Sequence, residues 1–320
     1  MGAEQFPALP TVDQAVASEI VAGGGLTPDE CREHVMKFAS HLEAAFRQRD
    51  HALGRYSPTP RSEIPDDSPL RRLVDDGITA FRLSDATFRK LAATFAPHVE
   101  SIRAHQMTKP VAKLKFADNC YPIRPGKGPA EYAMVDALID ELGLGETLSG
   151  FAGTKLGPRT LNVQVTRADW IAAHYGEIGA DGLPVKRGAY FHVDSEIWPH
   201  VKLLIYLTRD VDDQRGPFRY VRGSQDWCTP LELLIRQTND LLKASRAQYM
   251  SLPDAFRMHA LFGDDMRPDD PRLDRYLERE WAVTSQDGDV ILFDTNGVHR
   301  GGFVRSGERV ILQVLLGPVG

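Results

Sequence analysis

The chain has 320 residues, of which 42% are hydrophobic and 26% charged, as in an ordinary globular protein rather than a disordered or membrane one. Its net charge is -6 and its basic residues are interleaved with acids, which argues against binding to a nucleic-acid backbone. No apolar run reaches the roughly 18 residues that a membrane helix needs, and the first basic residue is Arg32, so the basic region of a secretory signal is missing. We therefore expect a cytoplasmic protein that binds neither nucleic acid nor a membrane.

The N-terminal part of the chain is expected to be helical. Thr27, Pro28 and Glu30 supply an N-cap, an N1 proline and a capping-box acid, and apolar residues recur at helical spacing to about Arg49. The following stretch, "RYSPTPRSEIPDDSP", predicts an irregular connection, because its prolines restrict themselves and the residues before them. We therefore divide the chain into a helical extension, residues 1–65, and a second domain, residues 66–320.

Short strands dominate the second domain. A strand through Ile78 and Phe81 precedes a helix capped by Ser84, and another helix is predicted from Glu131 to Leu142. Further on, β-rich runs are separated by Gly, Pro, Asp and Asn: "TLNVQVTR", "GAYFHVD", "VKLLIYLT", "FRYVRG", "EWAVT", "DVILFD" and "RVILQVLLG". This spacing predicts a β-sandwich or a jelly roll.

A helical segment, residues 229–280, interrupts the strand series. Connections of this length in a compact domain are usually functional, so we expect a lid over the mouth of the sheet. The alternative is a homodimer contact. The apolar face suited to it contains Leu231, Leu233, Leu234, Leu241 and Leu242.

The strand-like run "YFHVDSEIW" carries a His and an Asp two positions apart. In an extended chain such residues project from the same face of a sheet, so His192 and Asp194 can share one ion. Two other His–acid pairs with this spacing, beginning at His41 and His98, lie in helical patterns, where positions two apart point to different sides. In isolation the pair is as typical of a hydrogen bond near a strand end, so a metal site needs a third ligand.

The third candidate ligand is His299, which follows a buried strand near the C-terminus. Two histidines and one carboxylate on adjacent strands form the facial triad of non-haem Fe(II) oxygenases, which leaves coordination positions open. Arg309, at the start of the next strand, suits the distal carboxylate of 2-oxoglutarate. Asn162 and Gln164 are candidates for a second polar contact with this co-substrate, and hydrogen bonding to solvent is the alternative.

An ordered set of motifs resembles the phytanoyl-CoA dioxygenase-type branch of the Fe(II)/2-oxoglutarate oxygenases. "DGITAFRLSDATFRKL" is similar to the family's opening strand and helix, "FHVD" to its iron motif, and the tail from His299 to Arg309 to its distal ligand and co-substrate arginine. The likeness covers residues 74–100 and 160–317. It implies a mainly β fold with flanking helices and a double-stranded β-helix core, jelly-roll and cupin-like, in which the two histidines and the aspartate bind Fe(II).

Two segments depart from the family's pattern. The glycine turn of the family usually ends in Pro-Gly-Ser-His, whereas this chain has Arg222–Gln225 with the sequence "RGSQ". In the C-terminal tail, Gly301, Gly302 and Ser306 largely replace the common Asn and Ser or Thr. Minor co-substrate contacts therefore do not transfer to this chain.

The resemblance implies a dioxygenase that uses Fe(II), O2 and 2-oxoglutarate to hydroxylate a small organic substrate, with release of succinate and CO2. An acyl-CoA, an amino acid and a natural-product intermediate all fit as substrate, and desaturation and cyclisation stay open beside hydroxylation. From other classes, the scaffold suits a non-redox metal cupin, such as an isomerase, or a metal-free small-molecule binding protein. The first has no need for Arg309, and the second has no need for the triad.

Overall fold

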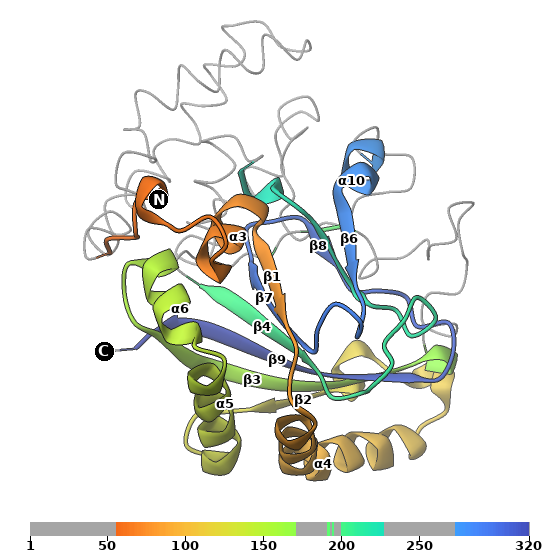
Figure 1. The fold of residues 1–320 in the computed structure, drawn as a ribbon. Coiled ribbons are helices and arrows are strands. Elements are labelled where there is room, and N and C mark those ends of the chain that lie inside the picture. Colours follow the sequence, from red (N-terminus) through yellow and green to blue (C-terminus); the bar gives the residue numbers. More distant parts are fainter. Residues whose placement is uncertain (1–55, 171–190, 193, 195–199, 227–272, 320) are drawn as a thin grey trace, which may run out of the picture.

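The structure is a computed structural model, and it describes residues 56–170, 191–192, 194, 200–226 and 273–319. Two antiparallel sheets face each other, and helices cover the outer side of the larger sheet (Figure 1). The predicted N-terminal helix and the part of the predicted insertion up to residue 272 lie outside the described residues. The domain boundary at residue 65 and the role of the insertion stay predictions.

The larger sheet has six strands in the order β1, β7, β4, β9, β3, β2. The bounds are β1 Ile78–Phe81, β2 Cys120–Ile123, β3 Leu156–Arg167, β4 Val201–Tyr206, β7 Val290–Asp294 and β9 Glu308–Pro318. Strand β4 is central, because Leu203 lies opposite Leu292 of β7 and Val314 of β9. Except for the short strand β2, these are the runs that the sequence predicts as strands.

The smaller sheet has three strands in the order β6, β5, β8. Strand β5 is Phe218–Val221, β6 is Glu280–Val283 and β8 is His299–Arg300. Glu280, at the predicted end of the insertion, is the first residue of β6. The two sheets form the predicted double-stranded β-helix, in which the shorter sheet covers one face of the longer.

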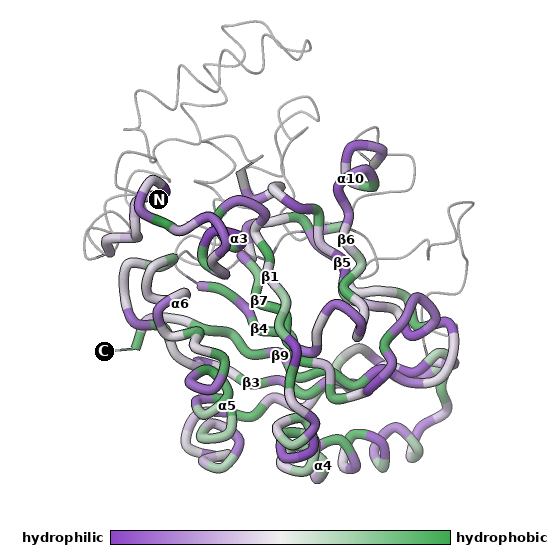
Figure 2. Tube along the Cα trace, viewed as in Figure 1, coloured by the Kyte–Doolittle hydropathy of each residue, from purple (hydrophilic) through white to green (hydrophobic). Residues whose placement is uncertain are grey.

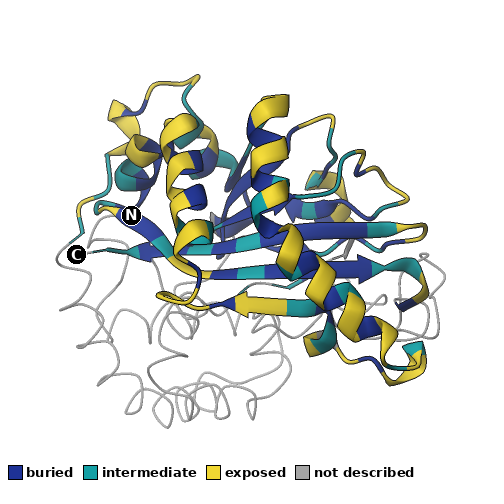
Figure 3. Cartoon of the chain, turned by 90° about the horizontal axis from the view of Figure 1, so that it is seen from below, coloured by how far each residue is buried: buried dark blue, intermediate teal, exposed yellow. Residues whose placement is uncertain are grey.

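Helices pack on the outer face of the larger sheet. They are α3 Pro69–Asp76, α4 Asp85–Met107, α5 Pro129–Glu141 and α6 Leu144–Ala152. Helix α10 Leu273–Arg279 instead contacts β5 of the smaller sheet. The 3-10 turns are η2 Arg61–Glu63, η3 Val111–Lys113, η4 Phe116–Asn119 and η5 Ser224–Asp226. Helices α4, α5 and α6 contact β3, and Figure 3 shows their buried sides toward the sheet and their exposed sides away from it. Within the described part of the chain, no helix is both long enough and apolar enough to cross a membrane.

Alternating side chains on the strands create two apolar layers. Val201 and Leu203 of β4 face the helices, whereas Leu204 and Tyr206 face the smaller sheet. Figure 2 shows the central strands as mainly hydrophobic and the helices as mixed. Each large apolar side chain that is fully buried contributes about 1.5–3 kcal/mol. Burial of the helix-side layer therefore stabilises the sheet, and polar residues that line the cavity lie on its other face.

Helix α3 corrects one prediction from the sequence. Its first residue, Pro69, belongs to the stretch that we interpreted as an irregular connection. The Ser68 hydroxyl accepts a hydrogen bond from the backbone N–H of Arg71 at 3.1 Å, so Ser68 is the N-cap and the proline is at N1. Gly77, with φ +76°, ends the helix. The last proline of the run therefore starts a helix rather than prolonging a loop.

The Ser84 cap gives a stability prediction. Ser84 Oγ accepts a hydrogen bond from the backbone N–H of Thr87 at 3.1 Å at the start of α4, as predicted. Ser84→Ala is expected to lower the free energy of unfolding by about 1 kcal/mol in urea denaturation. Ser101→Ala, an exposed change inside the same helix, is the control and is expected to be neutral or stabilising, because Ala favours helix. Equal stabilities for the two variants would contradict the cap.

Candidate metal centre

Backbone hydrogen bonds bring the two histidines together. The N–H of His192 donates to the carbonyl of His299 at 2.9 Å, and the N–H of His299 donates to the carbonyl of His192 at 2.8 Å. Side chains of such opposed residues project to the same face, and the two ring centroids lie 4.6 Å apart. The N–H of Asp194 donates to Thr295 O at 3.2 Å, which fixes the third residue beside them.

The three side chains offer ligand atoms to one point. One nitrogen of His192, one nitrogen of His299 and one oxygen of Asp194 lie within 4.8 Å of one another. Asp194 Oδ2 is 3.3 Å from His299 Nε2, and two atoms that bind one ion at about 2.1 Å and at a right angle lie roughly 3 Å apart. Nδ1–H of His299 donates to Gly297 O at 2.9 Å, which directs Nε2 toward the carboxylate. This donor set fits a divalent metal ion with open coordination positions.

The triad lines a cavity of about 290 Å³ between the two sheets. Gln164 also lines it, and its Oε1 accepts a hydrogen bond from Gln313 Nε2 at 3.1 Å. Asn162 is not among the described residues that line the cavity, and its side chain instead bonds to Cys120 on the neighbouring strand β2. Of the two polar candidates, the fold therefore brings Gln164 and not Asn162 to the triad.

Arg309 brings a buried guanidinium to the same cavity. Arg309 is 5% exposed, and its Nη1 donates hydrogen bonds to the carbonyl of Gly302 at 3.1 Å and to that of Gly216. A Cβ at Gly302 would come within 2.1 Å of the carbonyl oxygen of Pro217. Only glycine fits this close approach of two backbones, which accounts for one departure of the tail from the family's pattern.

Lys202, which is not among the site residues predicted from the sequence, lines the cavity as well. Its Nζ donates to Asp194 Oδ2 at 2.8 Å. Burial raises the pKa of the Asp194 carboxyl, but the positive charge of Lys202, followed by the two histidines, holds that pKa well below its ordinary value. Asp194 is therefore ionised and able to bind a cation. The feature of the sequence that could have indicated Lys202 is its position as the single cationic residue in the apolar run "VKLLIY".

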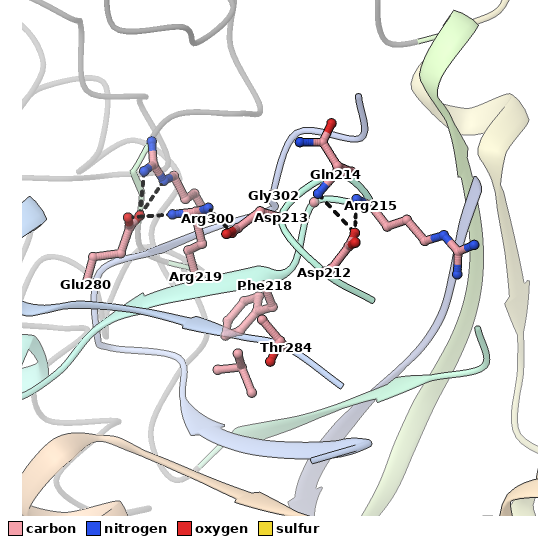
Figure 4. A network of polar contacts seen from close by, with 12 residues as sticks. Asp212, Asp213, Gln214, Arg215, Phe218, Arg219, Glu280, Thr284, Arg300 and Gly302 are labelled. Atoms are coloured by element: carbon pink, nitrogen blue, oxygen red, sulfur yellow. Dashed lines mark hydrogen bonds and ion pairs between the residues drawn. The ribbon is translucent and has the colours of Figure 1, made fainter. Parts of the chain in front are cut away.

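An ion-pair network holds strand β8, which carries His299. Arg300, 4% exposed, donates from Nε to Glu280 Oε1 at 2.7 Å, and Arg219 donates from Nη1 to Glu280 Oε2 at 2.8 Å (Figure 4). Arg219 also pairs with Asp213 at 3.0 Å. The network ties β8 to β5 and β6 on the side away from the triad. A two-residue strand thereby gains a fixed position.

The turn Arg222–Gln225 supports the same region. Ser224 Oγ accepts a hydrogen bond from the N–H of Val298 at 2.7 Å, directly before His299. Gln225 Nε2 donates to Val74 O at 3.0 Å. None of the four turn residues is among the described residues that line the cavity. In this chain the turn therefore contributes structure next to the site.

The fold and the triad are those of a non-haem metal oxygenase. A family model described as phytanoyl-CoA dioxygenase matches residues 75–310. The chain belongs to the phytanoyl-CoA dioxygenase family, as the sequence motifs indicate, and is an Fe(II)/2-oxoglutarate-dependent oxygenase. Its cofactors are Fe(II) and the co-substrate 2-oxoglutarate. No curated protein matches the chain.

Solved structures share the fold at low sequence identity. EctD from S. alaskensis in its apoform is 16% identical, with 82% of each chain covered and a TM-score of 0.50. The non-heme alpha ketoglutarate dependent carbocyclase SnoK from nogalamycin biosynthesis is 15% identical over 82% of this chain and 87% of that chain, with a TM-score of 0.45. HygX from Streptomyces hygroscopicus with nickel and 2-oxoglutarate bound is 15% identical over 77% and 85%, with a TM-score of 0.44.

The Glu280 network gives a second stability prediction. Glu280→Gln removes the carboxylate shared by Arg300 and Arg219, and it is expected to cost about 3–5 kcal/mol, because it breaks a buried ion pair by removing one partner. Urea denaturation measures the loss. Glu278→Gln on α10, where the side chain is exposed, removes the same charge and is expected to change stability little. Similar losses in both variants would show that the network does not stabilise β8.

Proposed function

We propose that the protein is a hydroxylase that oxidises a small organic substrate with O2 and 2-oxoglutarate and releases succinate and CO2. The observation that carries this proposal is one cavity shared by the metal triad and the buried guanidinium of Arg309. Fe(II) bound at the triad supplies the oxidising power, drawn from O2 and from decarboxylation of 2-oxoglutarate.

The proposal gives each side chain a role. His192, Asp194 and His299 would hold the ion, since each offers one ligand atom to the same point beside the cavity. Arg309 receives the distal carboxylate of 2-oxoglutarate in a two-pronged hydrogen bond. Gln164, already hydrogen-bonded to Gln313, offers a second polar contact, whereas the placement of Asn162 against Cys120 speaks against such a role for it.

The cavity walls support this chemistry. Leu204, Phe218, Phe293 and Ile311 line the cavity around the triad and belong to the apolar layer between the sheets. Apolar walls exclude water, which keeps the oxidant from reacting with solvent and strengthens the charge interactions of the bound groups. The chain's own contribution is therefore to position the ion and the co-substrate in a dry space.

The two rival functions each leave part of the cavity without a purpose. A metal cupin that acts as an isomerase has no use for a buried arginine at the metal cavity. A metal-free binding protein has no use for three ligand atoms within 4.8 Å of one another. The combination of triad and arginine thus favours the oxygenase.

The reaction type is tested by product analysis. The protein is incubated with Fe(II), 2-oxoglutarate, isotope-labelled O2 and a panel of acyl-CoAs, amino acids and polycyclic natural products. Hydroxylation gives succinate together with a product that contains one labelled oxygen atom. A product that has lost two hydrogen atoms and gained no oxygen would replace hydroxylation by desaturation or cyclisation, and product formation without succinate would overturn the proposal.

Alanine variants test the triad. His192→Ala, Asp194→Ala and His299→Ala are each expected to abolish succinate formation and to weaken Fe(II) binding, measured by anaerobic calorimetry, because each removes one of three ligands. The fold is expected to survive in circular dichroism, since the helix-side core is untouched. His98→Ala is the matched control, because His98 pairs with Glu131 between α4 and α5 at 2.6 Å and is not among the described residues that line the cavity. Normal iron content in any one triad variant would contradict the assignment.

Arg309→Lys tests the co-substrate anchor. Lysine keeps the charge but cannot form the two parallel hydrogen bonds, so the dissociation constant of 2-oxoglutarate is expected to rise about tenfold while metal affinity stays unchanged. Calorimetry of the metal-loaded protein measures both constants. Arg305→Lys, an exposed change in the same tail, is the control. An unchanged 2-oxoglutarate constant in Arg309→Lys would remove this residue from the site.

A further inference from the structure

The carboxamide of Gln164 reaches the metal cavity with one of its two ends already engaged. Gln164 is 7% exposed and lines the cavity, as does Gln313 on the neighbouring strand β9. Gln164 Oε1 accepts the hydrogen bond from Gln313 Nε2 at 3.1 Å, and Gln164 Nε2 has no acceptor among the described residues. An amide nitrogen carries two N–H donors. In this orientation Gln164 therefore keeps a donor for a ligand in the cavity.

The orientation of this carboxamide decides whether the cavity offers a donor or an acceptor. A carboxamide that rotates by half a turn exchanges its oxygen and its nitrogen with little change of shape. A carboxylate can only accept hydrogen bonds. Gln164 with Nε2 toward the cavity therefore attracts a carboxylate, and with Oε1 toward the cavity it repels one. The group that fixes the orientation thus determines whether a carboxylate binds.

A third amide, that of Asn162, lies beside Gln313. Asn162 is directly opposite Gln313 and belongs to β3, which lies between β2 and β9. Burial raises the pKa of the Cys120 thiol on β2, and a hydrogen bond from Asn162 opposes the rise, as expected when the amide nitrogen donates to sulfur. Asn162 Oδ1 is buried and has no partner among the described residues. Because Nδ2 is directed to β2, Oδ1 is directed away from it, toward the side on which Gln313 lies.

The three amides form a relay in which each one orients the next. If Gln313 turned its oxygen toward β3, that oxygen would face the oxygen of Asn162, and Gln164 would have to reverse in order to donate to it. Two buried oxygens that face each other without a hydrogen between them repel and lose a hydrogen bond. With its nitrogen toward β3, Gln313 donates to Gln164 and faces the acceptor of Asn162. The strand register makes this relay possible, because it places Gln313 opposite Asn162 and diagonal to Gln164.

We propose that Gln313 is a positioning residue, which holds the carboxamide of Gln164 with its nitrogen toward the cavity and so gives the cavity a hydrogen-bond donor for a carboxylate of 2-oxoglutarate. This inference rests on the proposed function, because it takes 2-oxoglutarate as the ligand of that donor. Asn162 acts one step further back, through Gln313. It therefore influences the co-substrate without contacting it.

The test is a double-mutant cycle that measures the dissociation constant of 2-oxoglutarate. The full chain is loaded with Mn(II), and anaerobic calorimetry records binding, so no turnover is needed. Gln313→Glu replaces the donor by a carboxylate, which accepts from Gln164 only if that carboxamide reverses. Gln164→Met removes the carboxamide and keeps the length of the side chain, and a double variant carries both changes. Constants are measured at neutral and at mildly alkaline pH, so that the introduced carboxyl is ionised.

The two changes are expected to be strongly non-additive. Gln164→Met is expected to raise the 2-oxoglutarate constant about tenfold, the effect of losing one charge-assisted hydrogen bond. Gln313→Glu is expected to raise it at least as much in the original protein. In the Gln164→Met background its factor is expected to be about tenfold smaller, because no carboxamide can reverse there and only the added charge acts. All variants are expected to bind Mn(II), which shows that they fold.

Gln313→Met provides a test without added charge. It leaves the carboxamide of Gln164 free to adopt both orientations, so the constant is expected to rise about twofold in the original protein, because half of the molecules then present the oxygen. No rise is expected in the Gln164→Met background. An unchanged constant in Gln313→Met, or a rise of the same size in both backgrounds, would overturn the inference.

The remaining outcomes separate the inference from the proposed function. An equal rise for Gln313→Glu in both backgrounds would assign its effect to charge alone and overturn the inference. An unchanged constant in Gln164→Met would also overturn it, because the donor would not contact the co-substrate, while the roles of the triad and Arg309 would stand. Failure of the original protein to bind Mn(II) and 2-oxoglutarate would refute the proposed function itself.

Discussion

The backbone bridge between His192 and His299 is the constraint on which the metal centre depends. The two residues are far apart in the sequence, and two reciprocal hydrogen bonds of 2.9 and 2.8 Å place their side chains on one face. Strand β8 is only two residues long, so its position is set by its other contacts. Those contacts include its pairing with β5, the Arg300–Glu280 ion pair and the hydrogen bond from Val298 to Ser224. Polar groups outside the cavity thus determine where a ligand inside it lies.

Arg300 and Arg309 show that the role of a buried arginine depends on the groups that contact its guanidinium. Arg300 lies against the carboxylate of Glu280, which neutralises it, and the pair therefore acts as a structural support. Arg309 donates hydrogen bonds to the carbonyls of Gly216 and Gly302, which orient its guanidinium. The first interaction stabilises the fold, and the second positions the group that we propose binds an anionic ligand.

The sequence predicts the strands and the triad because both follow a period of two. Apolar runs such as that of β7 have few alternative structures, and a His and an Asp two apart can meet only in an extended chain. Tertiary contacts are not encoded in this way. Lys202 stands out as a cation in an apolar strand, but only the fold brings its ammonium to Asp194. Glu280 belongs equally well to a helix end or a strand start until its arginine partners are known.

The same limit explains Asn162 and Gln164. Because side chains alternate along a strand, Asn162 and Gln164 project from one face of β3. The elements packed on that face, however, determine where along the strand the cavity lies. Gln164 lies between Ile311 of β9 and Cys120 of β2 and reaches the cavity, whereas Asn162 lies opposite Pro122 and its side chain bonds diagonally to Cys120. Sequence patterns thus select the face of a strand, and packing selects the position along it.

Charged groups that line one cavity impose a direction on a ligand. Arg309 and the triad line the same cavity, and Lys202 Nζ lies 2.8 Å from Asp194 Oδ2. Because the guanidinium is fixed by backbone carbonyls, a dicarboxylic co-substrate has one preferred direction, with its second carboxylate toward the triad. The arginine and the triad together therefore set the orientation of the proposed co-substrate inside the cavity.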